Sequence, residues 1–390
     1  MALSEEQKNW LALTLVPGVG SAGFIRLLAR FRTPGDVLRA SVGELAEVVD
    51  EKLADRIHHY ADAVDLTAQE RAVAEYDVDL ITLEDPSYPV RLAEIYDPPL
   101  VLFTRGELRD SDERGIAIVG TRRASPYGLR LAERFARELA ARGITIVSGM
   151  AAGIDAAAHR GALDAGGRTI AVLGNGVDVV YPRENAGLME AIIQSGCVIS
   201  QFPMGMESRA EHFPYRNRII SGISMGTLIV EAPLRSGALI TAKLAAEQGR
   251  EVFATPGPVG AVNSQGPHRL IQEGAKLVES VEDILVELDL PETRRSPAKA
   301  AVPDLPPPAP KTAQAPRKTP APPPTGATRS GPPLTPAEEN VLSVLAPEGS
   351  YVDEIALACR IPVSEALSSL TVLELKGMVR QFSGKRFAPR

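Results

Sequence analysis

The stretch GIAIVGTRRASPYGLRLAERFARELAARGITIVSG, residues 115–149, decides the fold. It begins and ends with a short run rich in isoleucine and valine, the composition of strands that are buried on both faces. Between the two runs, Leu129, Phe135 and Leu139 fall near one face of a predicted helix, and Gly143 ends that helix. A strand, a helix and a second strand in this order predict one β-α-β unit of a parallel sheet.

The same alternation continues to residue 280. The further apolar runs are RTIAVLG (168–174), CVISQF (197–202), TLIVEA (227–232), EVFATPG (251–257) and AKLVES (275–280). Repeated β-α units of this kind predict an α/β protein built on a Rossmann-like, doubly wound parallel sheet that occupies residues 113–288.

Two segments precede the predicted sheet. Residues 1–80 are predicted to be helical, with a Pro-Gly-Val-Gly turn typical of a SAM-like or helix-hairpin-helix domain. Gly18 and Gly20 would let a DNA backbone approach this turn, although a structural or partner-binding role fits the segment equally well. Residues 81–112, with their paired prolines, are predicted to be a connector.

Two segments follow the predicted sheet. Residues 289–333 hold 14 of the chain's 32 prolines, and this composition predicts a flexible, Pro-rich linker. Residues 334–390 show two or three helical patterns and then two short strands around Ser383 and Gly384, which is the pattern of a winged helix.

Composition and missing motifs exclude several classes of function. The formal net charge is -7 and the pI is about 5.5, so any site for anions must be local. No run of 18 apolar residues and no signal peptide is apparent, and we expect a cytoplasmic protein without a membrane span. The spacing of Cys197 and Cys359 supports neither a zinc site nor a disulfide framework. The chain lacks GxxxxGK[ST], GxGxxG, HExxH and GxSxG motifs, so we expect no catalytic residue, cofactor or metal.

Loops rich in Gly and Ser follow the predicted strands and lead into helices. Free backbone N–H groups and the helix dipole make such loops suited to anions. The cations near these loops are Arg122, Arg183, Arg216, Arg218, Arg235 and Lys243. Together they favour a ligand that carries phosphate. We expect structural roles for Asp155 as a helix cap, for His159 as a core or capping side chain, and for Glu231 as the partner of an arginine.

The order of several blocks resembles the DNA-processing protein A (DprA, also called Smf) family. The blocks are GTRRASPYG (120–128), SGMAAGIDAAAHRGAL (148–163), AVLGNGVDVVYPREN (171–185), HFPYRNRIISGIS (212–224), VEAPLRSGALITAKLAAEQGREVFATPG (230–257) and GPHRLIQEGAKLV (266–278). The resemblance implies a recombination mediator that binds single-stranded DNA, forms homodimers and helps to load the RecA recombinase in natural transformation. A role in repair is equally compatible with it.

The loops and the resemblance together predict the site residues. The predicted DNA-binding residues are Gly120, Thr121, Arg122, Gly149, Arg183, Phe213, Arg216, Asn217, Arg218, Ser236, Gly237 and Lys243. The resemblance places a dimer surface at His268, Ile271 and Leu277. The chain departs from the family at Glu211, where members often carry Lys, and this acidic residue should weaken the attraction for phosphate unless Arg209 compensates.

Single-stranded DNA is commonly held by a charged groove and by aromatic side chains that stack on bases. We expect Phe213 or Tyr215 to stack on a base, and the neighbouring arginines to project into the groove and bind phosphates. Ile219 and Ile220 should anchor the same helix to the sheet. The alternative is that Arg216 or Arg218 pairs inside the protein, since buried arginines must be paired.

Two other functions compete with DNA binding. The segment GTLIVEA faintly resembles the Lonely Guy-like nucleotide phosphoribohydrolases, which need Glu three residues after Thr227, whereas this chain has Val230 there and Glu231 one place later. A winged-helix transcription regulator is the second alternative. The tail lacks a dense basic recognition helix, which favours protein interaction or weak duplex contact over operator recognition.

Overall fold

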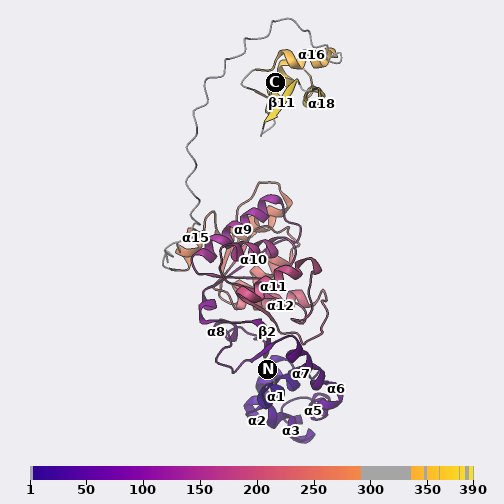
Figure 1. Ribbon diagram of the computed structural model, residues 1–390, viewed down its shortest axis with the longest axis vertical. Helices are drawn as coiled ribbons and strands as arrows, with labels where there is room; N and C mark the ends of the chain where they lie inside the picture. The colour runs from indigo at the N-terminus through magenta and orange to yellow at the C-terminus, as the bar shows by residue number, and fades with distance from the viewer. Residues whose placement is uncertain are drawn as a thin grey trace, which may run out of the picture. The chain divides into compact units, whose positions relative to one another are not determined.

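The structure is a computed structural model, and Figure 1 shows its course. It describes residues 3–290, 335–346, 349–359, 361–376, 378–382 and 386–389. The chain divides into two compact units, Met1–Pro303 and Asp304–Arg390. The linker predicted at 289–333 lies, from residue 291 on, outside the described residues.

The first unit begins with short helices: α1 (Glu5–Leu15), α2 (Ser21–Phe31), α3 (Pro34–Arg39), α4 (Val42–Ala46), α5 (Glu51–His58), α6 (Tyr60–Ala63) and α7 (Leu66–Glu75). Ser4 begins α1 with a capping box that it forms with Gln7, which satisfies two N–H groups at the helix start. The predicted turn between α1 and α2 contains Gly18 at a φ of 99°, which a side chain would disfavour, and Gly20 is the N-cap of α2. The helical prediction for this segment is therefore confirmed.

Within residues 3–290, nine strands form one mixed sheet in the order β1-β2-β6-β5-β4-β3-β7-β8-β9. Their bounds are β1 (Asp79–Thr82), β2 (Val101–Gly106), β3 (Gly115–Val119), β4 (Thr145–Ser148), β5 (Thr169–Val172), β6 (Cys197–Ser200), β7 (Gly226–Ile229), β8 (Glu251–Ala254) and β9 (Lys276–Leu277). Every predicted apolar run from residue 115 to 280 contains one of the parallel strands β3 to β9.

The strands predicted from residue 115 onward pair in parallel as expected, and two earlier strands extend the sheet with antiparallel pairs. β1 pairs antiparallel with β2, and β2 pairs antiparallel with β6, so that Thr104 lies opposite Ile199. The segment predicted as a connector, 81–112, therefore contains the end of β1 and all of β2. Pro98 and Pro99 stand just before β2, and β1 has only four residues. Neither strand therefore shows a clear alternation of apolar and polar residues in the sequence.

Helices cover both faces of the sheet, as a doubly wound fold requires. The helices after β1 are α8 (Val90–Ala93), α9 (Pro126–Ala141), α10 (Ile154–Asp164), α11 (Ala186–Ser195), α12 (His212–Gly222), α13 (Gly237–Glu247), α14 (Gln265–Gln272) and α15 (Val281–Glu287), with short 3-10 turns at Asp110–Arg114, Arg183–Asn185 and Val262–Ser264. Phe135 of α9 and Ile154 of α10 belong to the buried cluster on one face, which also includes α15. Ile219 and Ile220 of α12 belong to the cluster on the other face, with α8 and α13. The expected anchoring of α12 through these two isoleucines is confirmed.

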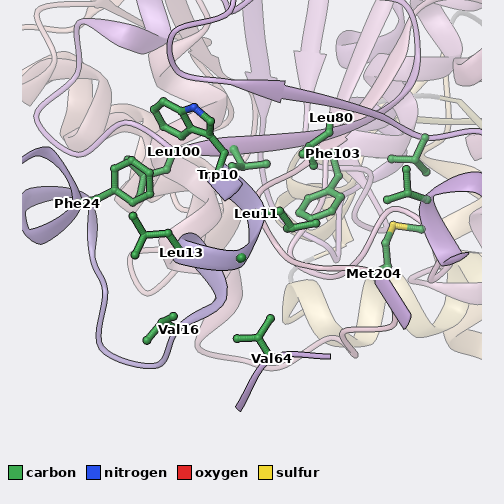
Figure 2. Close-up of a cluster of buried hydrophobic side chains, with 14 of the residues drawn as sticks. Trp10, Leu11, Leu13, Val16, Phe24, Val64, Leu80, Leu100, Phe103 and Met204 are labelled. Atoms are coloured by element: carbon green, nitrogen blue, oxygen red, sulfur yellow. The ribbon is translucent and has the colours of Figure 1, made fainter. Parts of the chain in front are cut away.

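The helical segment shares a core with the sheet. In Figure 2, Trp10 of α1 lies near Phe24 of α2, and Leu80 of β1 lies near Phe103 of β2. The Trp10 and Phe24 rings stack with their centroids 4.8 Å apart. These residues and Met204, which follows β6, form one continuous buried cluster. The α1–α7 helices and the sheet are therefore one packed body.

The second unit contains α16 (Pro336–Ser343), β10 (Ser350–Tyr351), α17 (Val352–Cys359), α18 (Val363–Leu375), β11 (Val379–Phe382) and β12 (Arg386–Pro389). The strand order is β10-β12-β11. Ile355 of α17, Leu370 of α18 and Phe387 of β12 belong to one buried hydrophobic cluster. Three helices with a small antiparallel sheet confirm the predicted winged helix. The turn expected at Ser383 and Gly384 lies outside the described residues.

Candidate nucleic-acid interface

The chain order reverses in the sheet at β3 and β7. From β3 the chain moves outward through β4, β5 and β6, then returns so that β7 lies on the other side of β3. In open α/β sheets, ligands bind at such a switch point, outside the carboxyl ends of the strands. The loop after β3, 120–123, and the loop after β7, 233–236, meet here and line a cavity.

This cavity has two adjoining parts, which together we call the strand-end groove. The basic hollow, of about 350 Å³, lies over the ends of β3 and β7, and the aromatic hollow, of about 390 Å³, lies beside it. The residues that line both are Arg122, Phe213, Asn217 and Gly237. The groove thus joins a charged part and a more apolar part.

Three exposed arginines surround the basic hollow. They are Arg122, Arg123 and Arg235. The guanidinium carbon of Arg122 lies 4.6 Å from the centroid of the Phe213 ring, a cation–π contact that holds the side chain over the groove. Among the described residues, none of the three arginines forms an ion pair with a carboxylate. The hollow therefore presents positive charge that is available to a phosphate.

Arg216 lies at the floor of the basic hollow and is only 3 % exposed. Its Nη1 donates to the carbonyl oxygen of Gly149 at 2.9 Å and to that of Val172. A Cβ at position 149 would lie 2.5 Å from the guanidinium, so Gly149 provides the space for this arginine. Burial lowers the pKa of Arg216 to about 10, which still leaves it charged at neutral pH. Its Nε has no partner among the described residues.

Two buried titratable groups of α10 lie beneath the hollow. Asp155 accepts the N–H of Gly149 at 3.2 Å, and burial raises its pKa to about 6 although Arg216 acts against that shift. His159 is fully buried, its Nδ1 lies 2.6 Å from Thr169 Oγ1, and burial lowers its pKa to about 3. His159 is thus the core histidine that we expected, whereas Asp155 supports the Gly149 loop instead of simply capping a helix.

Replacing Asp155 by asparagine should change how stability depends on pH. The unfolded carboxyl has a pKa near 3.8 and the folded one near 6, so the folded state holds this proton more tightly. The stabilisation that this tighter proton binding gives the folded state is complete below pH 3.8, and it is lost as the pH rises through about 6. In urea titrations, we therefore expect the difference in unfolding free energy between the wild type and Asp155→Asn to fall by roughly 2 kcal/mol between pH 4 and pH 7. His159 is common to both proteins and cancels. A difference that stays constant with pH would contradict the burial of an ionisable Asp155.

The aromatic hollow provides a place for a base. Tyr181 and Phe213 line it side by side with their ring centroids 5.6 Å apart, and Pro214 extends the apolar wall. A Cβ at Gly174 would lie 3.1 Å from the Phe213 ring, so this glycine lets the ring lie close to the strand end. Tyr181 is 39 % exposed and can therefore be reached by a ligand.

The start of α13 contributes to the opposite wall. Ser236 caps the helix by accepting the N–H of Ala238, and no atom lies within 4 Å of a Cβ placed at Gly237. An anion can approach the helix N-terminus closely at such an open glycine. On the loop after β3, Thr121 Oγ1 accepts the N–H of Arg123 and thereby fixes the turn.

Glu231 does not pair with an arginine, which corrects that expectation. Its carboxylate accepts the Ser125 N–H at 2.8 Å and the Ser125 hydroxyl at 2.5 Å. Asn263 also donates to it, at 3.2 Å. Glu231 therefore ties the start of α9 to the end of β7, a partner that sequence spacing could not reveal because Ser125 is 106 residues away.

Eight of the predicted DNA-binding residues line the groove: Gly120, Thr121, Arg122, Phe213, Arg216, Asn217, Ser236 and Gly237. Gly149 lies behind Arg216, and Arg183 is exposed at the 3-10 turn Arg183–Asn185. Arg218 does not line the groove, because it forms an ion pair with Asp97 at 3.1 Å. Lys243 lies in another cavity and pairs with Glu247 at 3.6 Å. The DNA contacts of all twelve residues remain predictions.

Other groove residues were not among the predicted site. Arg123 and Tyr181 line it, and Arg235 does so as well. Arg123 could have been found from the doubled arginine of GTRRAS, whereas Arg235 was already noted among the cations near the strand-end loops. Tyr181 lay in a quoted block but gave no separate signal. Arg209 and Glu211 are both exposed, with 3.9 Å between their charged groups, so Arg209 is placed to offset the acidic residue.

The predicted dimer residues lie together near one edge of the sheet. Leu277 belongs to the edge strand β9 and is 41 % exposed. Ile271 of α14 is half-buried. His268 Nε2 lies 3.0 Å from the carbonyl oxygen of Gly257. The role of these residues in a dimer remains a prediction.

In the part of the chain that the structure describes, no helix is long and apolar enough to cross a bilayer. The same residues include no cluster of three or more His, Cys, Asp or Glu side chains that could hold a metal ion.

Three family models match the chain. The model described as DNA recombination-mediator protein A matches residues 79–289, the DprA winged helix domain matches 316–385, and the SAM-like helix-hairpin-helix tandem matches 11–61. Protein Smf of Escherichia coli is 50% identical over 54% of this chain and 56% of its own length, so the match spans little more than half of that relative. Protein Smf of Synechocystis is 34% identical over 99% of this chain and 100% of its own length.

Two solved structures are similar to this chain. DNA processing protein A from Streptococcus pneumoniae matches with a TM-score of 0.64 and 36% identity, over 74% of this chain and 99% of that one. DNA processing protein A from Helicobacter pylori matches with a TM-score of 0.50 and 28% identity, over 55% of this chain and 97% of that one. The latter structure is described as giving insight into a single-stranded DNA binding mode.

Proposed function

This chain belongs to the DNA recombination-mediator protein A family, and from that premise we propose that it binds single-stranded DNA in the strand-end groove. One observation carries the proposal: a hollow with unpaired arginines and a hollow with aromatic rings adjoin at the switch point and share Arg122 and Phe213. Phosphates would lie in the basic hollow and a base would stack in the aromatic hollow. Duplex DNA keeps its bases stacked inside, so this groove favours single strands.

We further propose that the bound strand is handed to a RecA-type recombinase and that the chain acts as a homodimer in the cytoplasm. The implied process is recombination of incoming single strands in natural transformation, or repair. The family membership supports these proposals. Leu277 and Ile271, near the exposed edge at β9, support the dimer.

The groove does not favour an enzyme. In the competing phosphoribohydrolase, a glutamate after β7 would have to act on the ligand. Glu231 is only 6 % exposed and its carboxylate is held by Ser125 and Asn263. We therefore propose a binding protein without catalysis. Release of a free base from a nucleoside monophosphate by the purified protein would contradict this.

Phe213→Ala tests the aromatic hollow. We expect it to weaken the binding of a fluorescent oligo-dT by roughly 5- to 100-fold, because stacking of one base contributes about 1–3 kcal/mol. The slope of affinity against salt should hardly change, since no charge is removed. Fluorescence anisotropy over a salt series, with duplex as a competitor, measures both quantities.

Two variants make this test specific. Phe213→Trp should restore most of the affinity, and Tyr76→Ala, which removes a 39 % exposed tyrosine at the end of α7, should have no effect. If wild-type protein binds duplex as tightly as oligo-dT, or if Phe213→Ala binds normally, the groove is not the single-strand site.

A further inference from the structure

Asp97 connects three segments of the first unit. It lies between α8 and β2, and its carboxylate accepts hydrogen bonds from the Ser21 hydroxyl and, at 3.2 Å, from the Tyr215 hydroxyl. The Nε of Arg218 lies 3.1 Å from the same carboxylate and donates at 2.9 Å to the Asp97 carbonyl oxygen. One residue thus receives donors from α2 and from two positions of α12.

One side of this junction is the predicted DNA-binding helix α12, and the other is the turn for which DNA contact was one of two alternatives. Ser21 is the first residue of α2 and follows directly the turn that contains Gly18 and Gly20. Tyr215 and Arg218 lie in the first two turns of α12, the helix that carries Phe213 and Arg216 into the groove.

The α12 side of the junction is rigid. The Arg218 side chain is only 9% exposed, and its guanidinium carbon lies 4.1 Å from the centroid of the Tyr215 ring. Arg218 Nη1 also donates to the carbonyl oxygen of Tyr215 at 3.0 Å. A nearly buried guanidinium needs its carboxylate, because breaking such a pair leaves an uncompensated charge. Asp97 is therefore what fixes the start of α12.

We infer that Asp97 is a positioning residue that holds the groove-bearing end of α12 against the start of α2, so that a strand bound in the groove also orders the helical hairpin. The inference rests on the proposed function, since it assigns the groove to single-stranded DNA. This role explains why the Arg218 side chain is outside the groove, although Arg218 directly follows groove-lining residues in the sequence. It also makes the Gly18–Gly20 turn a second element that responds to the ligand.

Hydrogen exchange of the full chain, with and without an oligo-dT of about six nucleotides, tests this inference. In the wild type, DNA should slow exchange in residues 212–218 and also in residues 20–24. In Ser21→Ala, the Asp97–Arg218 pair remains, so protection of 212–218 should persist while protection of 20–24 is lost. Asp97→Asn should lose both the protection of 20–24 and about tenfold in affinity for oligo-dT.

The control is Ser87→Ala, whose hydroxyl bonds only locally to Asp85 at 2.7 Å, and it should behave as the wild type. If Ser21→Ala keeps full protection of 20–24, the junction does not transmit the ligand's effect and the inference is wrong, even if Asp97→Asn fails to fold. If the wild type does not bind oligo-dT at all, the proposed function fails instead.

Discussion

Replacing Arg122, Arg123 and Arg235 together by alanine should lower the affinity for oligo-dT by more than about 100-fold. The three side chains are exposed around the basic hollow and have no carboxylate partner among the described residues, so their charge is free to meet phosphates. Each charge-assisted hydrogen bond to a phosphate contributes about 1 kcal/mol or more, and 1.4 kcal/mol is a factor of ten. The slope of log affinity against log salt should also fall by about three, one for each lost contact.

A matched variant separates the groove from the overall charge. Arg109, Arg137 and Arg160 are also exposed, but they pair with acidic side chains and do not line the groove. Their triple alanine variant removes the same charge and should bind oligo-dT with little change. Equal losses in the two variants would show that net charge, and not the groove, controls binding.

Replacing Arg216 by alanine should lower the free energy of unfolding by about 2–4 kcal/mol, because it leaves buried carbonyl oxygens without their donor. The substitution removes the hydrogen bonds to the carbonyl oxygens of Gly149 and Val172, and also the positive charge that opposes the raised pKa of Asp155. Urea unfolding at pH 7 measures this loss. Arg216→Lys keeps the positive charge but not the planar guanidinium group. Its free energy of unfolding should lie between those of the wild type and Arg216→Ala.

The control for stability is Arg137→Ala, which removes a surface arginine 3.2 Å from Asp164. It should change the unfolding free energy little, because exposed ion pairs contribute little. If Arg216→Ala is as stable as this control, Arg216 does not hold the Gly149 loop, and its place at the floor of the groove has to be reconsidered.

The sheet was largely predictable and its edge was not. Strands β3 to β7 lie in buried, apolar runs, and helices such as α9 show a clear apolar face before Gly143. The β1–β2 hairpin escaped notice because only its pairing with β6, about 100 residues away, makes these short segments part of the sheet. Local pattern cannot reveal a partner so far along the chain.

The candidate site, too, was predictable only in part. The strand-end loops were predictable, because any doubly wound sheet brings the ends of β3 and β7 together. The direction of each arginine was not. Arg216 and Arg218 are two positions apart on one helix, yet the first points to the sheet and the groove floor, and the second points to Asp97. Helical spacing separates the two faces but does not say which face carries the ligand.

The pairing of β2 with β6 has a consequence for synthesis on the ribosome. Phe103 of β2 must wait for its partner Ser200 of β6, 200 − 103 = 97 residues later, and the core around Trp10 is complete only when Met204 has emerged. At about 5–20 residues per second, this delay is roughly 5–20 s. During that time the nascent chain exposes the free edge of β2 and an open apolar surface, which makes it a target for chaperones. The helices made first are thus among the last to reach their final packing.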